Sequence, residues 1–516
     1  MSAAIGPAAS SGALGHLDPP ASGPFRRLAF AAPYLPLLVE AGAVTALFAI
    51  VFHCIGGAKF PNDDAYIGLH NAQVLWLGHD AAYRGVPALV GATSGVHLAL
   101  LMLFESLVSP APLALFVLCA AAAVAYVLAI HALCLNAGCS RAIAFAFAIA
   151  SLCFAGSLFQ FLNGLETGLA MTAVACDLAL LASNRYRWLL AILCGLMPFV
   201  RPELAVLSLG SMLIVFGDST KSRGEKTVAA ALAIAAAIPF LAWYWIDTGS
   251  FIPSTIDAKN YFYAQANLPM AAKFIWFAQS MIVGIVYAFP IFLCVPAIRS
   301  RPLRALCLSF VAIVLFAYLE RLPGGLRFNS GRYLFIFVPI VLYGLIDAYA
   351  APEPWRRRLA RRCMVAALIP TVGAAVQQYQ SYKYYLTFYR AGVVETVAWA
   401  NAHIPPGAMV MVHDAGYVAY AGDFRLVDLT GLKTPRSVAI NRQLTFPANG
   451  AMRPQAMAEI ADLFHPRYLI AVKSWNADYR IAQSLRRDGW RVTRIFESAR
   501  APRDAEIYEI FALRKN

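Results

Sequence analysis

The chain has 516 residues, of which 60% are hydrophobic and only 14% are charged. A soluble globular protein has about 45–50% apolar and about 25% charged residues, so this composition excludes an ordinary soluble enzyme and indicates a polytopic membrane protein. The formal net charge of +14 does not indicate a nucleic-acid partner, because Lys and Arg form short clusters between apolar segments, for example at 185–187 and 356–362. Such clusters mark the cytoplasmic loops of membrane proteins.

The apolar residues are distributed unevenly along the chain. Residues 1–32, rich in Ala, Gly, Ser and Pro, are predicted to be a disordered cytoplasmic tail. Apolar segments dominate from 33 to 380, where we expect an all-α transmembrane bundle. From 390 to 516 ordinary polarity returns, and predicted helices alternate there with apolar strand-like runs such as 408–412. This alternation predicts a small soluble α/β domain.

The order of apolar segments and basic clusters predicts eleven membrane crossings, with the N-terminus in the cytoplasm and the C-terminal domain in the periplasm. The predicted crossings are 33–54, 111–135, 141–161, 168–183, 188–200, 204–217, 227–247, 272–297, 303–319, 333–350 and 363–380. Segment 64–78 is too polar to span and is expected to lie at the membrane interface. Segment 95–109 is shorter than the roughly 20 residues that a spanning helix needs, and we expect it to be re-entrant.

With this topology, five polar groups fall on the outer face, although membrane crossings separate them in the sequence. The groups are Asp63 with Asp64, Glu166, Arg201 with Glu203, Asp257 with Lys259, and Arg332 with Tyr333. Ionisable residues in or beside a bilayer are costly and usually functional. Sugar transfer from a phosphate-linked donor needs a carboxylate to accept the proton of the attacking hydroxyl, and cations to stabilise the leaving phosphate. The five groups supply both kinds of side chain.

Structural roles stay open for the same residues. Asp63 and Asp64 could cap the helix that follows them, since Asp is favoured at a helix N-terminus. Glu166 and Glu203 could form polar pairs inside the bundle. Lys259 could be a solvated loop residue.

Five short strings occur in an order typical of one enzyme superfamily. They are Asn62-Asp63-Asp64-Ala65-Tyr66-Ile67, Gly164-Leu165-Glu166-Thr167, Arg201-Pro202-Glu203, Pro253-Ser254-Thr255-Ile256-Asp257-Ala258-Lys259 and Gly331-Arg332-Tyr333-Leu334. Together they resemble the bacterial membrane glycosyltransferases of the GT-C superfamily, and the chain is similar to the mycobacterial terminal arabinofuranosyltransferases. The resemblance covers about residues 60–350. It implies a polyprenyl-phosphate-sugar donor and transfer to a glycan or lipid acceptor on the periplasmic side of the bacterial inner membrane.

The resemblance also implies roles for individual residues. Asp63 would be the general base of an inverting displacement, and Asp64 would assist it or bind a divalent cation such as Mg²⁺ or Mn²⁺. From their charge and predicted position, the candidates for binding the donor phosphate are Arg201, Lys259 and Arg332. Substrate-binding or supporting residues would be Glu166, Glu203, Asp257, Tyr333 and Tyr66.

The sequence departs from the family pattern in two places. Leu204 stands where the family often has Gly after Arg-Pro-Glu, and residues 83–95 lack the expected pattern, so the sugar and the acceptor stay open. Two other functions also stay open. A transporter or flippase of lipid-linked sugars would explain the helices and the helix break at Arg201-Pro202-Glu203. A non-catalytic scaffold for envelope assembly would tolerate loss of the Asp pair.

Overall fold

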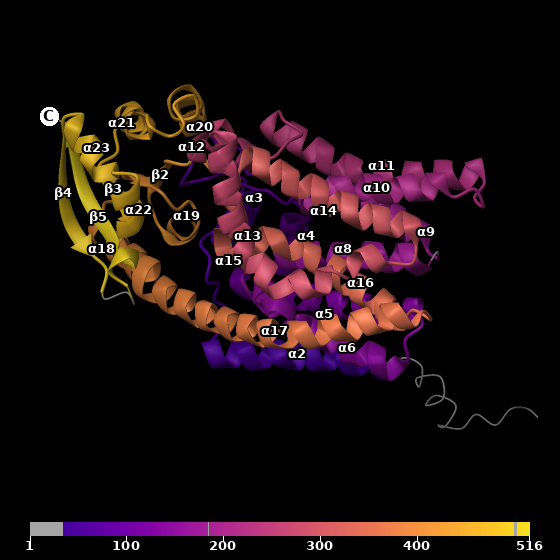
Figure 1. The fold of residues 1–516 in the computed structure, drawn as a ribbon. Helices are drawn as coiled ribbons and strands as arrows, with labels where there is room; N and C mark the ends of the chain where they lie inside the picture. Colours follow the sequence, from indigo (N-terminus) through magenta and orange to yellow (C-terminus); the bar gives the residue numbers. More distant parts are fainter. Residues whose placement is uncertain (1–34, 184, 500–502, 516) are drawn as a thin grey trace, which may run out of the picture.

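The computed structural model describes residues 35–183, 185–499 and 503–515. The predicted tail at 1–32 lies outside these residues. A bundle of helices makes up most of the molecule, and a small sheet lies at one end of it (Figure 1). The helices of the bundle are α2 Leu35–Ile55, α3 Asp64–Leu77, α4 Gly95–Glu105, α5 Ala111–Ala137, α6 Arg141–Cys153, α7 Ser157–Leu162, α8 Thr167–Ser183, α9 Arg187–Val200, α10 Leu204–Gly217, α11 Arg223–Thr248, α12 Ser254–Tyr263, α13 Met270–Phe292, α14 Arg301–Arg321, α15 Phe328–Gly331, α16 Val338–Ala350 and α17 Pro354–Tyr389.

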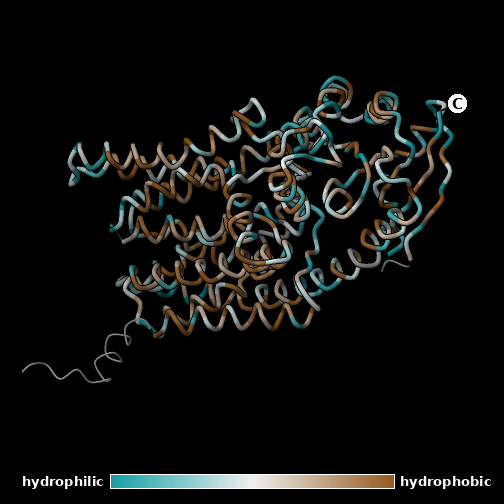
Figure 2. Tube along the Cα trace, turned by 180° about the vertical axis from the view of Figure 1, so that it is seen from behind, coloured by the Kyte–Doolittle hydropathy of each residue, from teal (hydrophilic) through white to brown (hydrophobic). Residues whose placement is uncertain are grey.

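Seven helices in the described part of the chain are long and apolar enough to cross a membrane. They are Leu35–Ile55, Ala111–Ala137, Arg141–Leu162, Arg223–Thr248, Arg301–Arg321, Gly325–Ala350 and Pro354–His403. Hydrophobic residues run along most of the bundle, and hydrophilic residues gather near its ends (Figure 2). The count of eleven crossings is not confirmed, although each predicted segment coincides with a helix. Segments 168–183, 188–200 and 204–217 form helices of only 17, 14 and 14 residues.

Two local predictions can be compared with the structure directly. The chain does break at Arg201, between α9 and α10, and this arginine is fully buried. Helix α3, which was predicted to lie at the membrane interface, is packed within the protein. Eight of its 14 residues are buried, because α4, α5 and α19 Tyr417–Ala421 pack against it.

The C-terminal region, residues 395–515, contains one mixed five-stranded sheet. Its strands are β1 Met409–Val412, β2 Arg425–Asp428, β3 Tyr468–Val472, β4 Trp490–Glu497 and β5 Tyr508–Lys515, in the order β2-β1-β3-β5-β4. Strand β1 is parallel to β2 and β3, while β5 is antiparallel to β3 and β4. The helices of this region are α18 Glu395–His403, α19, α20 Pro435–Ile440, α21 Arg453–Phe464, α22 Lys473–Asp478 and α23 Ile481–Arg487. The predicted α/β character of this region is therefore present.

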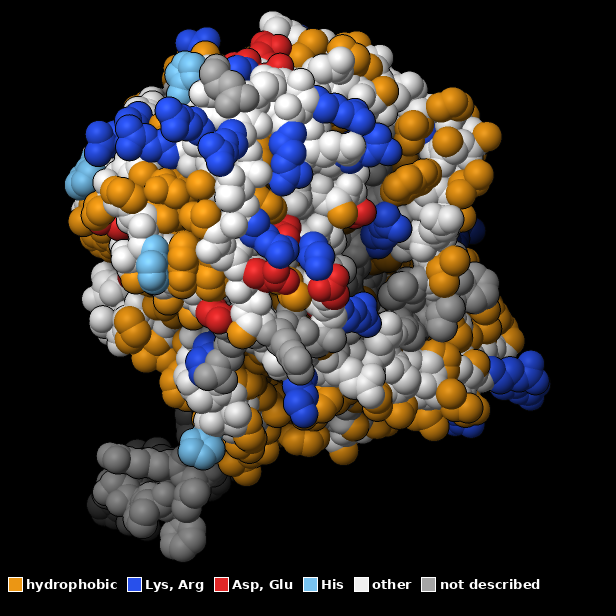
Figure 3. Space-filling view, turned by 90° about the vertical axis from the view of Figure 1, so that its left-hand side faces the viewer, with side chains coloured by type: hydrophobic (Ala, Val, Ile, Leu, Met, Phe, Trp, Pro, Cys, Tyr) orange, Lys and Arg blue, Asp and Glu red, His pale blue; other side chains and the backbone are white. Residues whose placement is uncertain are grey.

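The carboxyl ends of the three parallel strands face the bundle. The loop after β1 contacts Asp63, and the loop after β2 reaches Asn71 in α3 through Lys433. After β3, the ring of Trp475 stacks on that of Phe262 in α12. In Figure 3 the C-terminal region faces the viewer, and charged side chains are spread over its upper and central parts. The edge at which open α/β sheets bind ligands is thus turned toward the membrane helices.

Candidate active site

A cavity of about 510 Å³ lies beside α12, at the end of the bundle that carries the C-terminal region. Its polar lining comes from residues far apart in the sequence. The charged residues that line it are Glu166, Arg201, Glu203, Asp257, Lys259, Arg321 and Arg332. Tyr333 lines it as well. The structure therefore brings together four of the five polar groups that the sequence placed on one face.

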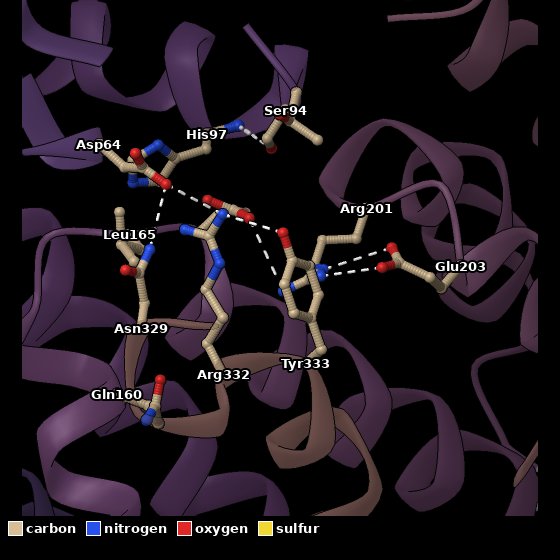
Figure 4. A network of polar contacts seen from close by, with 12 residues as sticks. Asp64, Ser94, His97, Gln160, Leu165, Arg201, Glu203, Asn329, Arg332 and Tyr333 are labelled. Atoms are coloured by element: carbon tan, nitrogen blue, oxygen red, sulfur yellow. Dashed lines mark hydrogen bonds and ion pairs between the residues drawn. The ribbon is translucent and has the colours of Figure 1, made fainter. Parts of the chain in front are cut away.

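Arg201 is the centre of a buried ion-pair network (Figure 4). Its Nη2 lies 2.9 Å from Oε1 of Glu203, and its Nη1 lies 3.7 Å from Oε1 of Glu166. Tyr318 also donates a hydrogen bond to Glu203. Because Arg201 has only 1% of its surface exposed, its charge needs these partners. The break between α9 and α10 positions Arg201 and Glu203 on this cavity.

Tyr333 joins the three cations that were predicted to bind phosphate. Its ring lies between two guanidinium groups, with Cζ of Arg201 4.7 Å and Cζ of Arg332 5.0 Å from the ring centroid. Its hydroxyl oxygen accepts hydrogen bonds from Nη2 of Arg332 at 3.1 Å and from Nζ of Lys259 at 3.3 Å. The ring and hydroxyl of Tyr333 thus contact three positive charges at once.

Asp64 lines a smaller cavity next to the first one. Its Oδ2 lies 3.1 Å from Nη2 of Arg332 and accepts a hydrogen bond of 3.1 Å from Nδ2 of Asn329. Five residues line both cavities and so form the wall between them, namely Thr93, Glu166, Thr255, Lys259 and Arg332. Arg332 therefore lies between Asp64 and the larger cavity and contacts both.

The side chain of Asp63 points toward the C-terminal region. Its Oδ2 accepts a hydrogen bond of 2.8 Å from the backbone N–H of Gly416, and its Oδ1 accepts one of 2.7 Å from that of Tyr417. Burial raises the pKa of Asp63 well above its usual value, and the carboxylate of Asp414 raises it further, against the two backbone N–H groups that lower it. The side chain of Asp63 lines neither cavity.

Tyr66 also stays away from both cavities. Its ring packs against Tyr417 at 5.0 Å and against Tyr420 at 5.6 Å between ring centroids. It attaches α3 to α19 and so supports the loop that holds Asp63.

Glu166 is strongly stabilised as an anion. Burial alone would raise its pKa, but the guanidinium groups of Arg332 and Arg201 lower that pKa to about 2. Glu166 therefore stays ionised at neutral pH and acts as a fixed counter-charge.

The side chains around Asp64 do not fit a divalent cation, the cofactor that the resemblance implied. The guanidinium of Arg332 lies 3.1 Å from Oδ2 of Asp64, so a divalent cation at that oxygen would meet a like charge. Within residues 35–183, 185–499 and 503–515, no group of three His, Cys, Asp or Glu side chains is arranged to hold a metal ion. Mg²⁺ and Mn²⁺ take oxygen ligands, and Arg332 and Asn329 offer nitrogen donors at this position.

Two cations of the larger cavity have no carboxylate partner in the described part of the chain. Lys259 donates only to the hydroxyl of Tyr333, and Arg321 makes no ion pair. The sequence analysis missed Arg321, which ends α14. The same charge-based topology could have identified it, because Arg321 follows the predicted outward crossing 303–319 and so falls on the face predicted for Arg332.

Other missed residues line or support the cavities. Thr93 and Thr255 share a hydrogen bond of 3.0 Å between their hydroxyl oxygens, and Asn329 holds Asp64. Gly416 and Tyr417 hold Asp63 through their backbone N–H groups, for which the sequence carries no signal.

The fold has known relatives among solved structures. The structure of ArnT from Cupriavidus metallidurans bound to undecaprenyl phosphate superposes with a TM-score of 0.53 at 12% identity, covering 91% of this chain and 97% of that chain. Arabinofuranosyltransferase AftD from Mycobacteria matches with a TM-score of 0.48 at 14% identity. That match covers 94% of this chain but 40% of AftD, so the present chain spans less than half of that protein's length. The chain has a GT-C-like fold, as its sequence strings predicted.

Sequence comparison adds one match. Residues 374–510 match a family described as a domain of unknown function, DUF8728. The match begins within α17 and includes most of the sheet and the loop that holds Asp63. No curated protein matches the chain significantly.

Proposed function

We propose that this protein is a membrane glycosyltransferase that transfers a sugar from a polyprenyl-phosphate-linked donor to a glycan or lipid acceptor. The proposed setting is the periplasmic face of the bacterial inner membrane, with the N-terminus in the cytoplasm and the C-terminal region in the periplasm. One observation carries the proposal. The 510 Å³ cavity is lined by four cations and by exposed apolar side chains, and Asp64 contacts one of those cations, Arg332, from the neighbouring cavity.

The two sides of the cavity match the two parts of such a donor. Arg201, Lys259, Arg321 and Arg332 supply four positive charges near the candidate phosphate position, and Arg binds phosphate oxygens in a two-pronged geometry. On the other side, Ile252 and Ile256 are 63% and 43% exposed, and Leu322 and Ala317 lie nearby. Exposed apolar side chains next to membrane-spanning helices suit a polyprenyl chain rather than a water-soluble nucleotide.

In the proposed reaction, a hydroxyl oxygen of the acceptor attacks the anomeric carbon as the bond from that carbon to the phosphate oxygen breaks. The polyprenyl phosphate leaves with the electron pair, and the attack from the opposite side inverts the configuration. The acceptor proton goes to the carboxylate of Asp63, whose raised pKa makes it a better base than an ordinary carboxylate. Each Asp63 oxygen accepts one backbone hydrogen bond and keeps a further lone pair for this proton.

Asp64 then has a different task from Asp63. Its contact with Arg332 holds that guanidinium toward the leaving phosphate, with Tyr333 and Lys259 on the other side. Because these donors are fixed before the reaction, they stabilise the developing phosphate charge without reorganising. We propose that Asp63 acts on the acceptor side and Asp64 on the donor side.

The test uses the purified full-length protein in detergent, where no second compartment exists. Mass spectrometry of envelope glycans and polyprenyl-phosphate sugars in a deletion strain first identifies the missing product and the accumulated donor. The purified protein is then supplied with that donor and acceptor. Formation of the glycosylated product supports the proposal, whereas a transporter would give none.

Three Asp→Asn variants separate the roles. Asp63→Asn is expected to abolish transfer, and Asp64→Asn to weaken donor use while the protein still inserts into the membrane. Asp218→Asn is the matched control, because Asp218 pairs with Arg187 on the loop after α10, away from both cavities. Near-normal turnover by Asp63→Asn, with loss only in Asp64→Asn, would assign the base to Asp64 instead.

A further inference from the structure

A second cavity lies on the flank of the bundle and shares no lining residue with the candidate active site. It is a groove of about 570 Å³ between α2, the α6–α7 segment and α17. All three walls belong to helices long and apolar enough to cross a membrane. Ile50 and Tyr379, which line it, are 60% and 67% exposed. The volume falls within the roughly 300–1,000 Å³ range of ligand-binding pockets.

The groove has a built polar site on its α17 side. Gln378 and Tyr382 both line it, and each has only 7% of its surface exposed. In the described part of the chain, the Gln378 Oε1 and the Tyr382 hydroxyl have no hydrogen-bond partner. Leaving such a group buried and unpaired costs about 1–3 kcal/mol, so each is expected to have a partner outside the chain.

The position of Gln378 is fixed by a glycine. Gly156, with φ +85°, lies between η1 Phe154–Gly156 and α7, and a Cβ there would approach Cγ of Gln378 to 2.2 Å. A side chain at 156 would therefore push Gln378 away. Glycine tolerates the left-handed backbone at this point, and its lack of a side chain leaves room for Gln378, whose unpaired Oε1 lies beside the groove.

One end of the groove is positively charged. Lys59 follows the end of α2, and Lys383 lies six residues before the end of α17, both at the end of the bundle that carries the C-terminal region. Lys383 is exposed and makes no ion pair within the described ranges. Among the described residues that line the groove none is acidic, so the two lysines give it a net positive charge.

From these contacts we propose that the groove binds a membrane phospholipid whose headgroup carries an anionic phosphate and free hydroxyl groups, as in phosphatidylglycerol. The apolar walls would hold the acyl chains. The two lysines would pair with the phosphate, to which the Tyr382 hydroxyl would donate. The Gln378 carbonyl would accept from a headgroup hydroxyl, a contact that a choline headgroup lacks. The lipid would link α2 to α17, the helix that leads into the C-terminal region.

The test measures lipid binding to the delipidated full-length protein by native mass spectrometry. Phosphatidylglycerol, phosphatidylcholine and undecaprenyl phosphate are titrated separately. We expect phosphatidylglycerol to bind about tenfold more tightly than phosphatidylcholine, as one charge-assisted contact predicts. Equal binding of the two phospholipids would overturn the proposal. Tighter binding of undecaprenyl phosphate than of phosphatidylglycerol, lost in the groove variants below, would also overturn it.

Variants locate the binding. The double variant Lys59→Gln/Lys383→Gln is expected to lose the preference for phosphatidylglycerol, and Tyr382→Phe to weaken its binding about threefold to tenfold. Lys226→Gln at the start of α11 and Tyr385→Phe in α17 are matched controls outside the groove and should bind as the wild type does. Unchanged binding in the double variant would refute the site. Asp63→Asn should bind the phospholipid normally, so failure of this proposal and failure of the proposed function are distinguishable.

Discussion

Replacing Gly416 by Ala is expected to separate Asp63 from the C-terminal region. A Cβ at this position would lie 2.1 Å from the Asp63 carbonyl oxygen and 2.6 Å from its Oδ2. Real Cβ atoms essentially never approach another heavy atom within 3.0 Å, so the loop must move by most of an ångström. The hydrogen bonds from Gly416 and Tyr417, now 2.8 and 2.7 Å, cannot both survive this shift.

The size of the effect follows from these two bonds. A hydrogen bond to an ionised carboxylate contributes about 1.5–3 kcal/mol, so losing both removes about 3–6 kcal/mol from the contact between Asp63 and the loop. At about 1.4 kcal/mol per tenfold change in rate, even the lower value corresponds to a roughly 100-fold loss of transfer if Asp63 must be held there. The helices of the bundle keep their own packing, so the melting temperature should change far less than the activity.

The assay compares initial rates of transfer and thermal melting for the wild type, Gly416→Ala and Gly373→Ala. Gly373 lies in α17, where an added Cβ meets nothing within 4 Å, so this variant controls for the substitution itself. The reasoning is refuted if Gly416→Ala transfers sugar at the wild-type rate. It is also refuted if activity falls only in proportion to loss of folded protein.

Three other predictions concern charge. Lys259→Gln and Arg321→Gln should each raise the KM for the donor about tenfold with a smaller change in kcat, measured by steady-state kinetics. Glu166→Gln should lower the free energy of unfolding by about 3 kcal/mol, because the buried guanidinium of Arg201 loses a counter-ion. A thermal melting assay measures this loss. Since the folded-state pKa of Glu166 is lowered to about 2, its contribution is full above about pH 4.5 and is lost as the pH falls toward 2. Asp414→Asn should move the acidic limb of the kcat–pH profile to lower pH, because the Asp414 charge raises the pKa of Asp63; an unmoved limb would contradict Asp63 as the base.

Much of the helical architecture was predictable because each membrane helix satisfies its own backbone hydrogen bonds and so leaves an apolar segment in the sequence. The number of crossings was not predictable in the same way. Whether α9 and α10, with 14 residues each, reach across a bilayer depends on the neighbours that cover their ends. Strand β2 was missed because its four residues, Arg425–Asp428, carry no alternating pattern long enough to detect.

The candidate site was predictable to the extent that charge determines topology. Basic loops placed Arg201, Lys259 and Arg332 on one face, and the structure has them around a single tyrosine ring and its hydroxyl. The orientation of Asp63 depends instead on backbone N–H groups more than 350 positions away in the chain. Backbone donors exist at nearly every residue, so no composition or spacing could single out Gly416.

Asp63 and Asp64 are adjacent in the sequence but are held by different parts of the molecule. Asp64 is positioned by Arg332 and Asn329 of the bundle, whereas Asp63 is positioned by the loop after β1. In the proposed reaction, an acceptor that reaches Asp63 would enter between these two parts of the molecule, while the cavity proposed for the donor lies on the other side of Arg332. In-line displacement requires the attacking and leaving oxygens on opposite faces of the anomeric carbon. The proposed reaction divides the pair accordingly, with Asp63 acting on the attacking oxygen and Asp64 acting on the leaving phosphate through Arg332.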